Sequence, residues 1–350
     1  MSNTNVRIEL RSSPHVVKGT GVERIMYNVV LAILPICGFS IWQYGLSALA
    51  LILTVTLTCL ATERAFNKAM ATANTLSDWS ATITGLLLAL SLPPSFPLWM
   101  AVVAGFVAMA LGKLMFGGIG NNVFNPALVG RAFVQAAFPV SISTWAPAFS
   151  SHRFSEFIPT TLTLPFMTPP DISAWAKHAV DGFTGATPLS RWKFENVLAT
   201  PHDFLYGTVT ASAGETSAIL LLLGGLYLAA RRFLDWRIPV AVLGSAALLA
   251  WAFHLADPGR YPDPLFVLLS GGILLGAIFM ATDMATSPVT PKGVWIYGVL
   301  IGVVTLMIRF FGGLTEGVMY AILIGNALTP MIDQYTQPRV FGQAGKARKT

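Results

Sequence analysis

The chain has 350 residues, of which 54% are hydrophobic and only 11% are charged. This charged fraction lies far below that of soluble domains, which excludes an ordinary water-soluble protein, because so much apolar surface needs lipid around it. The net charge of +6 does not indicate nucleic acid binding, since the basic residues are scattered between apolar runs. Cys37 and Cys59 lack metal-ligand spacing, so no metal site, iron–sulfur site or disulfide framework is predicted.

Residues 1–24 are polar, and the first apolar run starts near residue 25, which is too late for a cleaved signal. Ten apolar stretches follow that we expect to cross about 30 Å of hydrocarbon as helices. They lie near residues 25–43, 46–62, 79–94, 98–116, 125–143, 216–233, 238–255, 264–283, 293–311 and 315–332. The third is short and breaks at Pro93-Pro94, which predicts a half-helix or a kinked span.

The distribution of Lys and Arg orients these spans. Most basic residues fall in segments that share one side with the N-terminus, so we expect both the N-terminal segment 1–24 and the tail 333–350 in the cytoplasm. The segment 144–215 then lies on the periplasmic or outer side. Its aromatic content favours order, and a loop of this length is commonly functional.

The membrane segments 25–143 and 216–332 resemble each other at an offset of 195 residues. Phe116-Gly-Gly aligns with Phe311-Gly-Gly, and Pro93 aligns with Pro288. Each segment holds five predicted spans, and because five is odd the second copy enters the membrane from the opposite side. The prediction is an all-α membrane protein of two five-helix inverted repeats with one long extracytoplasmic loop. Chance matching of Gly and apolar residues is the alternative explanation.

One string in the outer loop carries specific chemistry. It matches the pattern Asp-x-x-Ser/Thr-Gly-Ala-Thr, which a flavin transferase uses to esterify FMN to the last threonine. Small neighbours clear the approach of the threonine hydroxyl to phosphorus, and an exposed turn lets the transferase hold the backbone. The residues of this candidate flavin site are Asp181, Thr184, Gly185, Ala186 and the acceptor Thr187.

A second string runs from Phe116 to Arg131 and is rich in Gly and Asn. Such residues let backbone amides face a ligand, and Asn125-Pro126 can start a helix whose N-terminus favours negative charge. Close helix packing explains the same glycines equally well. The candidates for an ion site or a second flavin site in this string are Gly117, Gly118, Asn121 and Asn125. A third string, Asp78 to Leu86, is typical of a capped helix entry before the Pro93-Pro94 break.

At these three strings the chain resembles the D subunit of the bacterial Rnf (Rsx) ion-translocating oxidoreductase complex, over nearly its whole length. The B subunit of the sodium-pumping NADH:quinone reductase is a sister with a longer N-terminal extension, so the Rnf family member is favoured. The resemblance implies FMN on Thr187, a noncovalent riboflavin in the spans, and the Rnf A, B, C, E and G subunits as partners. It also implies coupling of ferredoxin and NAD redox chemistry to sodium or proton movement.

The chain itself would be an electron relay with no catalytic residue of its own. A Gly-x-Gly-x-x-Gly fingerprint is absent from the sequence, so NAD is expected on other chains. The alternative is a solute channel or transporter without a redox role, which an inverted repeat suits equally well. A third possibility is a structural scaffold for other flavoproteins.

Four charged residues lie near the ends of predicted spans: Lys113, Arg131, Asp283 and Glu316. A charge within the membrane is costly and is retained mainly when it is paired or functional. Asp283 and Glu316 are therefore candidates for the coupling-ion site. The alternative is that all four side chains extend to the membrane surface and are solvated there.

Overall fold

The computed structural model describes residues 21–71, 75–172, 175, 186–207, 209–215 and 217–338, and within these ranges it contains helices and no β-strand. Each of the ten apolar stretches contains helix. Five helical segments are long and apolar enough to cross a membrane: Val22–Tyr44, Leu46–Ala69, Leu98–Phe116, Arg237–Ala256 and Pro291–Phe311. Shorter apolar helices cover Ser80–Ser91 and Ala218–Ala230. These features define a multi-pass membrane protein.

The first half of the chain forms one layer. It comprises α1 (Val22–Tyr44), α2 (Leu46–Ala69), the 3-10 turn η1 (Leu76–Asp78), α3 (Ser80–Ser91), α4 (Leu98–Gly112), η2 (Leu114–Phe116), α5 (Pro126–Ala137) and α6 (Pro139–Ile142). Within it, α2 packs on α3 and α4, and α4 packs on α5. The predicted break after the third apolar stretch is confirmed, because α3 ends at Ser91 just before Pro93-Pro94.

The second half forms the other layer. It comprises α10 (Ala218–Ala230), α11 (Arg237–Ala256), α12 (Pro264–Leu269), α13 (Ile273–Leu275), the π-helical turn η3 (Gly276–Met280), α14 (Pro291–Phe311) and α15 (Val318–Thr336). The stretch 264–283 is therefore three short pieces, not one continuous helix. Ser270 and Gly271 interrupt it, and Gly271 has a φ of +65° that favours glycine.

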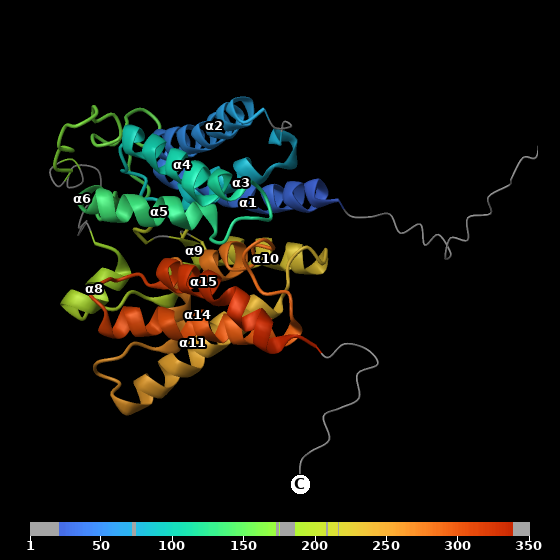
Figure 1. Ribbon diagram of the computed structural model, residues 1–350. Coiled ribbons are helices and arrows are strands. Elements are labelled where there is room, and N and C mark those ends of the chain that lie inside the picture. Colours follow the sequence, from blue (N-terminus) through green and yellow to red (C-terminus); the bar gives the residue numbers. More distant parts are fainter. Residues whose placement is uncertain are drawn as a thin grey trace, which may run out of the picture.

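The two halves lie side by side, with α1 against α10 and α5 against α15 (Figure 1). Between them in sequence come α8 (Pro188–Glu195) and α9 (Pro201–Tyr206). The segment before α10 covers the break after α3, since the Ala213 and Gly214 amides donate to the carbonyls of Leu92 (3.0 Å) and Leu90 (2.7 Å). These bonds satisfy backbone groups that the short helix leaves open.

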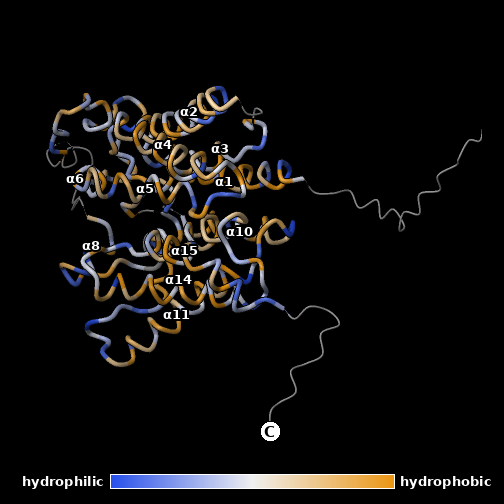
Figure 2. The backbone as a smooth tube through the Cα atoms, viewed as in Figure 1, coloured by the Kyte–Doolittle hydropathy of each residue, from blue (hydrophilic) through white to orange (hydrophobic). Residues whose placement is uncertain are grey.

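The outward faces of the helices remain apolar. Leu57, Leu226, Leu248 and Trp251 are each more than half exposed. Figure 2 shows hydrophobic residues along the helices of both halves, with hydrophilic residues gathered at helix ends and connections. Lipid, and not water, is the solvent that such surfaces fit.

Candidate functional site

Thr187, the predicted flavin acceptor, is the residue at which α8 begins. Its Oγ1 accepts a hydrogen bond from the Ser190 amide (3.3 Å) and donates to Ser190 Oγ (3.2 Å), and Pro188 occupies the first helical position. Threonine followed by proline is a favourable helix start. Ala186 precedes it in the structure, whereas Asp181, Thr184 and Gly185 lie outside the described residues.

The expected exposure of this threonine is wrong. The Thr187 side chain is only 5% exposed. Beside it lies a small cavity, which Leu189, Phe204, Glu215 and Glu316 also line. The hydroxyl thus faces the interior of the protein instead of open solvent.

Lys193 anchors α8 to the second half of the molecule by hydrogen bonds. Its Nζ donates to three carbonyl oxygens, those of Arg309 (2.9 Å), Gly312 (2.6 Å) and Leu314 (2.8 Å), around the C-terminal end of α14. Lysine satisfies carbonyls that a helix end leaves without partners. Burial lowers the pKa of Lys193. Trp192 adds an edge contact with Phe310, with the ring centroids 5.8 Å apart.

A buried group of charges lies between the halves close to Thr187. Arg131 of α5 and Glu316 form an ion pair of 2.6 Å, and Arg309 donates to the carbonyls of Val267 (2.7 Å) and Ser270 (3.1 Å). Glu215 is 7% exposed; burial first, and then the charge of Glu316, raise its pKa above the usual carboxyl range. Low-dielectric surroundings make each of these charges depend on its neighbours.

A larger hollow of about 400 Å³ adjoins the other side of the α8 start. Ala186 and Ser190 line it together with Arg131, Glu316 and the aromatic side chains of Trp145 and Phe194. Arg131 therefore takes part in the ion pair and also lines this hollow. This placement brings a cation near the residue predicted to carry a phosphate.

The Gly- and Asn-rich string lies at the other end of α5. Gly117, Gly118 and Gly120 all have positive φ values, between 84° and 102°, which only glycine adopts readily. Asn125 caps α5, since its Oδ1 accepts from the amides of Ala127 (3.0 Å) and Leu128 (3.4 Å). Its Nδ2 donates to the Met280 carbonyl (3.1 Å), which links the first half to the π-helical turn of the second.

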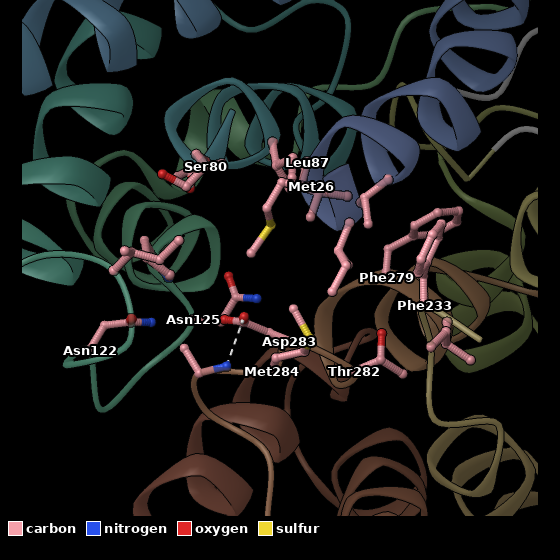
Figure 3. A pocket seen from close by; sticks show the side chains of 18 of the residues that line it. Met26, Ser80, Leu87, Asn122, Asn125, Phe233, Phe279, Thr282, Asp283 and Met284 are labelled. Carbon is pink, nitrogen blue, oxygen red and sulfur yellow. Dashed lines mark hydrogen bonds between the residues drawn. The ribbon is translucent and has the colours of Figure 1, made fainter. Parts of the chain in front are cut away.

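A cavity of about 90 Å³, which we call the interface cavity, opens beside Asn125 between the two halves. Most of its walls are apolar, and its polar lining residues are Ser80, Thr84, Lys113, Asn122, Asn125, Thr282 and Asp283. Figure 3 shows Met26, Ser80 and Leu87 from the first half facing Thr282, Asp283 and Met284 from the second. Asp283 accepts from the Ala285 amide (3.2 Å) and from Thr286 Oγ1 (3.4 Å).

The residues predicted as candidates for an ion site or a second flavin site lie in different parts of the structure. Asn125 and Asp283 meet at the interface cavity, whereas Glu316 belongs to the charge group beside Thr187. Gly117, Gly118 and Asn121 shape the connection before α5 and do not line that cavity, although the neighbouring Asn122 does. The two predicted ion candidates therefore belong to different sites.

The alternative explanation, that these charged side chains are solvated at the membrane surface, is wrong for Lys113 and Arg131. These two residues are 3% and 7% exposed. Lys113 pairs with Glu63 at 2.5 Å, a partner that sequence reasoning missed because the second apolar stretch was ended at residue 62. Arg309, which lies within the apolar stretch 293–311, is 1% exposed. Its position inside an apolar run was the signal that could have revealed its burial.

Comparison with known proteins agrees with this class of membrane protein. The chain belongs to the NQR2, RnfD, RnfE family, whose model matches residues 9–342. The resemblance to the Rnf D subunit stated from the sequence is thereby confirmed.

Several relatives are similar along almost the whole chain. The D subunit of the proton-translocating ferredoxin:NAD(+) oxidoreductase complex of Clostridium ljungdahlii is 39% identical, covering 95% of this chain and 96% of the relative. The D subunit of the Na(+)-translocating ferredoxin:NAD(+) oxidoreductase complex of Acetobacterium woodii is 38% identical, covering 96% of each. The D subunit of the ion-translocating oxidoreductase complex of Halorhodospira halophila is also 38% identical, with the same coverage.

Proposed function

We propose that this chain is the D subunit of an Rnf-type complex and relays electrons by means of FMN esterified to Thr187. The complex would couple electron exchange between ferredoxin and NAD to movement of sodium ions or protons. The relatives named as D subunits of ion-translocating ferredoxin:NAD(+) oxidoreductases support the complex. The observation that carries the flavin assignment is the acceptor threonine at the start of α8, beside a hollow that Arg131 lines.

The residues around Thr187 fit a phosphoester. A phosphate at this position would meet the N-terminal amides of α8, where the helix dipole favours negative charge. Arg131, which pairs with Glu316, lines the adjoining hollow and would help to balance that charge, and Trp145 and Phe194 offer apolar surface there. Lys193 fixes α8, so the tether would start from a rigid point. FMN, when bound, supplies reversible electron acceptance and donation.

Because the Thr187 hydroxyl is buried, we infer that the flavin transferase acts before α8 packs against the second half, or after its start moves away. The transferase is therefore a maturation partner. Asp181, Thr184, Gly185 and Ala186 complete its recognition string in this proposal, as the sequence pattern implies.

The interface cavity suits the second, noncovalent flavin, riboflavin. Its apolar walls with a few polar groups are typical of sites that hold a ring system. Asn122, Asn125 and Asp283 would fix the orientation of the ligand by hydrogen bonds. Asp283 is also the better candidate for the coupling ion, since Glu316 already has Arg131 as its partner at 2.6 Å.

The proposal includes ten spans in two inverted repeats. In support, α2 packs on α4 and α4 on α5 in the first half, and α11 packs on α14 and α14 on α15 in the second. Asn122 and Asn125, which follow Phe116-Gly-Gly in the sequence, line the interface cavity. The carbonyl of Gly312 in Phe311-Gly-Gly instead accepts a hydrogen bond from Lys193 near Thr187. The two matched motifs thus lie near different sites.

We further propose a bacterial inner-membrane location, with 1–24 and 333–350 cytoplasmic and the segment 144–215 periplasmic. The membrane domains would be 25–143 and 216–332. The Rnf A, B, C, E and G subunits would be the partners, and they would handle NAD and iron–sulfur chemistry. These assignments extend the resemblance and the distribution of basic residues.

In-gel fluorescence of the denatured chain tests the covalent flavin. Thr187→Ala should abolish the fluorescent band. Thr200→Ala is a matched control, because Thr200 also precedes a proline and begins a helix, yet it is exposed and outside the acceptor string. A dark wild-type band would favour the channel or transporter alternative. Unchanged electron transfer by the Thr187→Ala complex would favour the scaffold.

A further inference from the structure

The ion pair between Lys113 and Glu63 is the most deeply buried pair of charges in the described part of the chain. The Lys113 side chain is 3% exposed and that of Glu63 is 0% exposed, and Nζ lies 2.5 Å from Oε1. A buried pair is often replaceable by apolar side chains without loss of stability, so its presence does not follow from folding alone. The proposed function so far gives it no role.

This pair belongs to a continuous chain of hydrogen bonds. On one side, Lys113 Nζ donates to Ser80 Oγ (2.5 Å), and Ser80 Oγ donates to Asp78 Oδ1 (2.5 Å). On the other side, Thr75 Oγ1 donates to Glu63 Oε1 (2.9 Å), and Asn67 Nδ2 donates to Thr75 Oγ1 (2.9 Å). Hydrogen bonds in which the donor or the acceptor is ionised are stronger than those between neutral groups.

The hydrogen bonds through Ser80 connect the interface cavity with the protein surface. Lys113 and Ser80 both line the interface cavity, and Ser80 appears at its edge in Figure 3. Asp78 is half-buried, and its neighbours Ser77 and Trp79 are exposed. Three proton-exchanging groups, an ammonium, a hydroxyl and a carboxyl, therefore lead from the cavity wall to the protein surface.

We propose that Asp78, Ser80 and Lys113 form a proton path between the surface around residues 77–79 and the interface cavity, with Glu63 holding Lys113 in place. This rests on the proposed function, which puts a redox group in that cavity. A group that gains electrons in an apolar cavity needs a charge-compensating proton, and Lys113 is the cation among the described residues that line it.

Each proton moves along this path from the protein surface toward the interface cavity. One N–H bond of the Lys113 ammonium breaks, and the proton passes into the cavity. The Ser80 hydroxyl, which donates to Asp78 in the structure, then turns toward Lys113 Nζ, gives it a proton and takes one from the Asp78 carboxyl, which has gained that proton from solvent. Glu63 stays ionised, and electrons reach the cavity only from the redox partners of the complex, never along this path.

Stopped-flow reduction of the purified whole complex by dithionite tests the path, with absorbance of the noncovalent flavin as the signal. Ser80→Ala removes the linking hydroxyl, and Asp78→Asn removes the titratable proton but keeps an acceptor for the Ser80 amide. Both should slow the proton-dependent phase about tenfold or more and change its solvent deuterium isotope effect. Ser80→Thr, which keeps the hydroxyl, should behave as wild type, and so should Ser77→Ala in the same exposed turn.

Flavin content, measured after extraction, separates the two ideas. Wild-type complex without extractable flavin overturns the cavity assignment and the path with it. Ser80→Ala and Asp78→Asn complexes that keep full flavin content, wild-type rates and the wild-type isotope effect overturn the path alone.

Discussion

Arg131 of α5 and Glu316, just before α15, join the two halves of the molecule through an ion pair of 2.6 Å with little exposure of either side chain. Arg131→Met leaves the Glu316 carboxylate buried without its partner. We expect the free energy of unfolding to fall by about 3 to 5 kcal/mol, seen as a lower thermal midpoint in detergent. The double variant with Glu316→Met should recover much of the loss.

Arg191 and Glu195 provide the control for that prediction. Their pair spans 3.6 Å on the exposed face of α8. Arg191→Met should shift the midpoint little, because exposed pairs contribute about 1 kcal/mol or less. Equal losses at Arg131 and Arg191 would show that burial of the first pair does not matter.

Lys193 should determine how firmly α8 is held. Lys193→Met removes the hydrogen bonds to the carbonyls of Arg309, Gly312 and Leu314. We expect amide hydrogen exchange in α8 to accelerate about tenfold or more. Lys292→Met, at an exposed position on α14, should leave α8 exchange unchanged. Protection of α8 in the Lys193 variant would contradict its role as the fastening residue.

Glu215 should make stability depend on pH. Its pKa is raised in the folded protein, so the folded state binds the proton more tightly than the unfolded state does. This contribution is fully present below the unfolded pKa and is lost as the pH rises through the folded pKa. Glu316, Arg131 and Arg309 act on the same group. Thermal midpoints measured from below the unfolded pKa to above the folded pKa of Glu215 should fall more steeply with pH for wild type than for Glu215→Gln. Parallel curves would refute the raised pKa of Glu215.

Asp283 should affect ion coupling more than covalent flavin attachment. Asp283→Asn keeps an acceptor for the Ala285 amide but removes the charge at the cavity wall. In proteoliposomes containing the complex, ion transport should drop severalfold while covalent flavin content stays constant. Asp235→Asn, at an exposed pair with Arg237, is the control. Normal transport by the Asp283 variant would remove it as a coupling residue.

The local residue pattern predicted much of the helical architecture. The ten apolar stretches all contain helix, and α3 stops before Pro93-Pro94 because proline cannot continue the hydrogen-bond ladder. Thr187-Pro188 is a favourable helix start by residue type, and α8 begins there in the structure. These features depend on neighbours within a few residues, so one sequence suffices to find them.

Long-range pairing could not be predicted in the same way. Lys113 and Glu63 are 50 residues apart, and Arg131 and Glu316 are 185 apart. Nothing in the local pattern at either residue identifies its partner. The burial of Thr187 was missed for the same reason, since Glu215 and Glu316 approach it from distant parts of the chain. Tertiary packing decides these contacts.

Intact-mass analysis of the chain purified from cells that contain the flavin transferase shows directly whether Thr187 carries FMN. We expect a polypeptide heavier by one FMN less one water, with fragmentation placing the addition on Thr187, and an unmodified mass for Thr187→Ala. An unmodified wild-type chain, or a flavin on another residue, would contradict it.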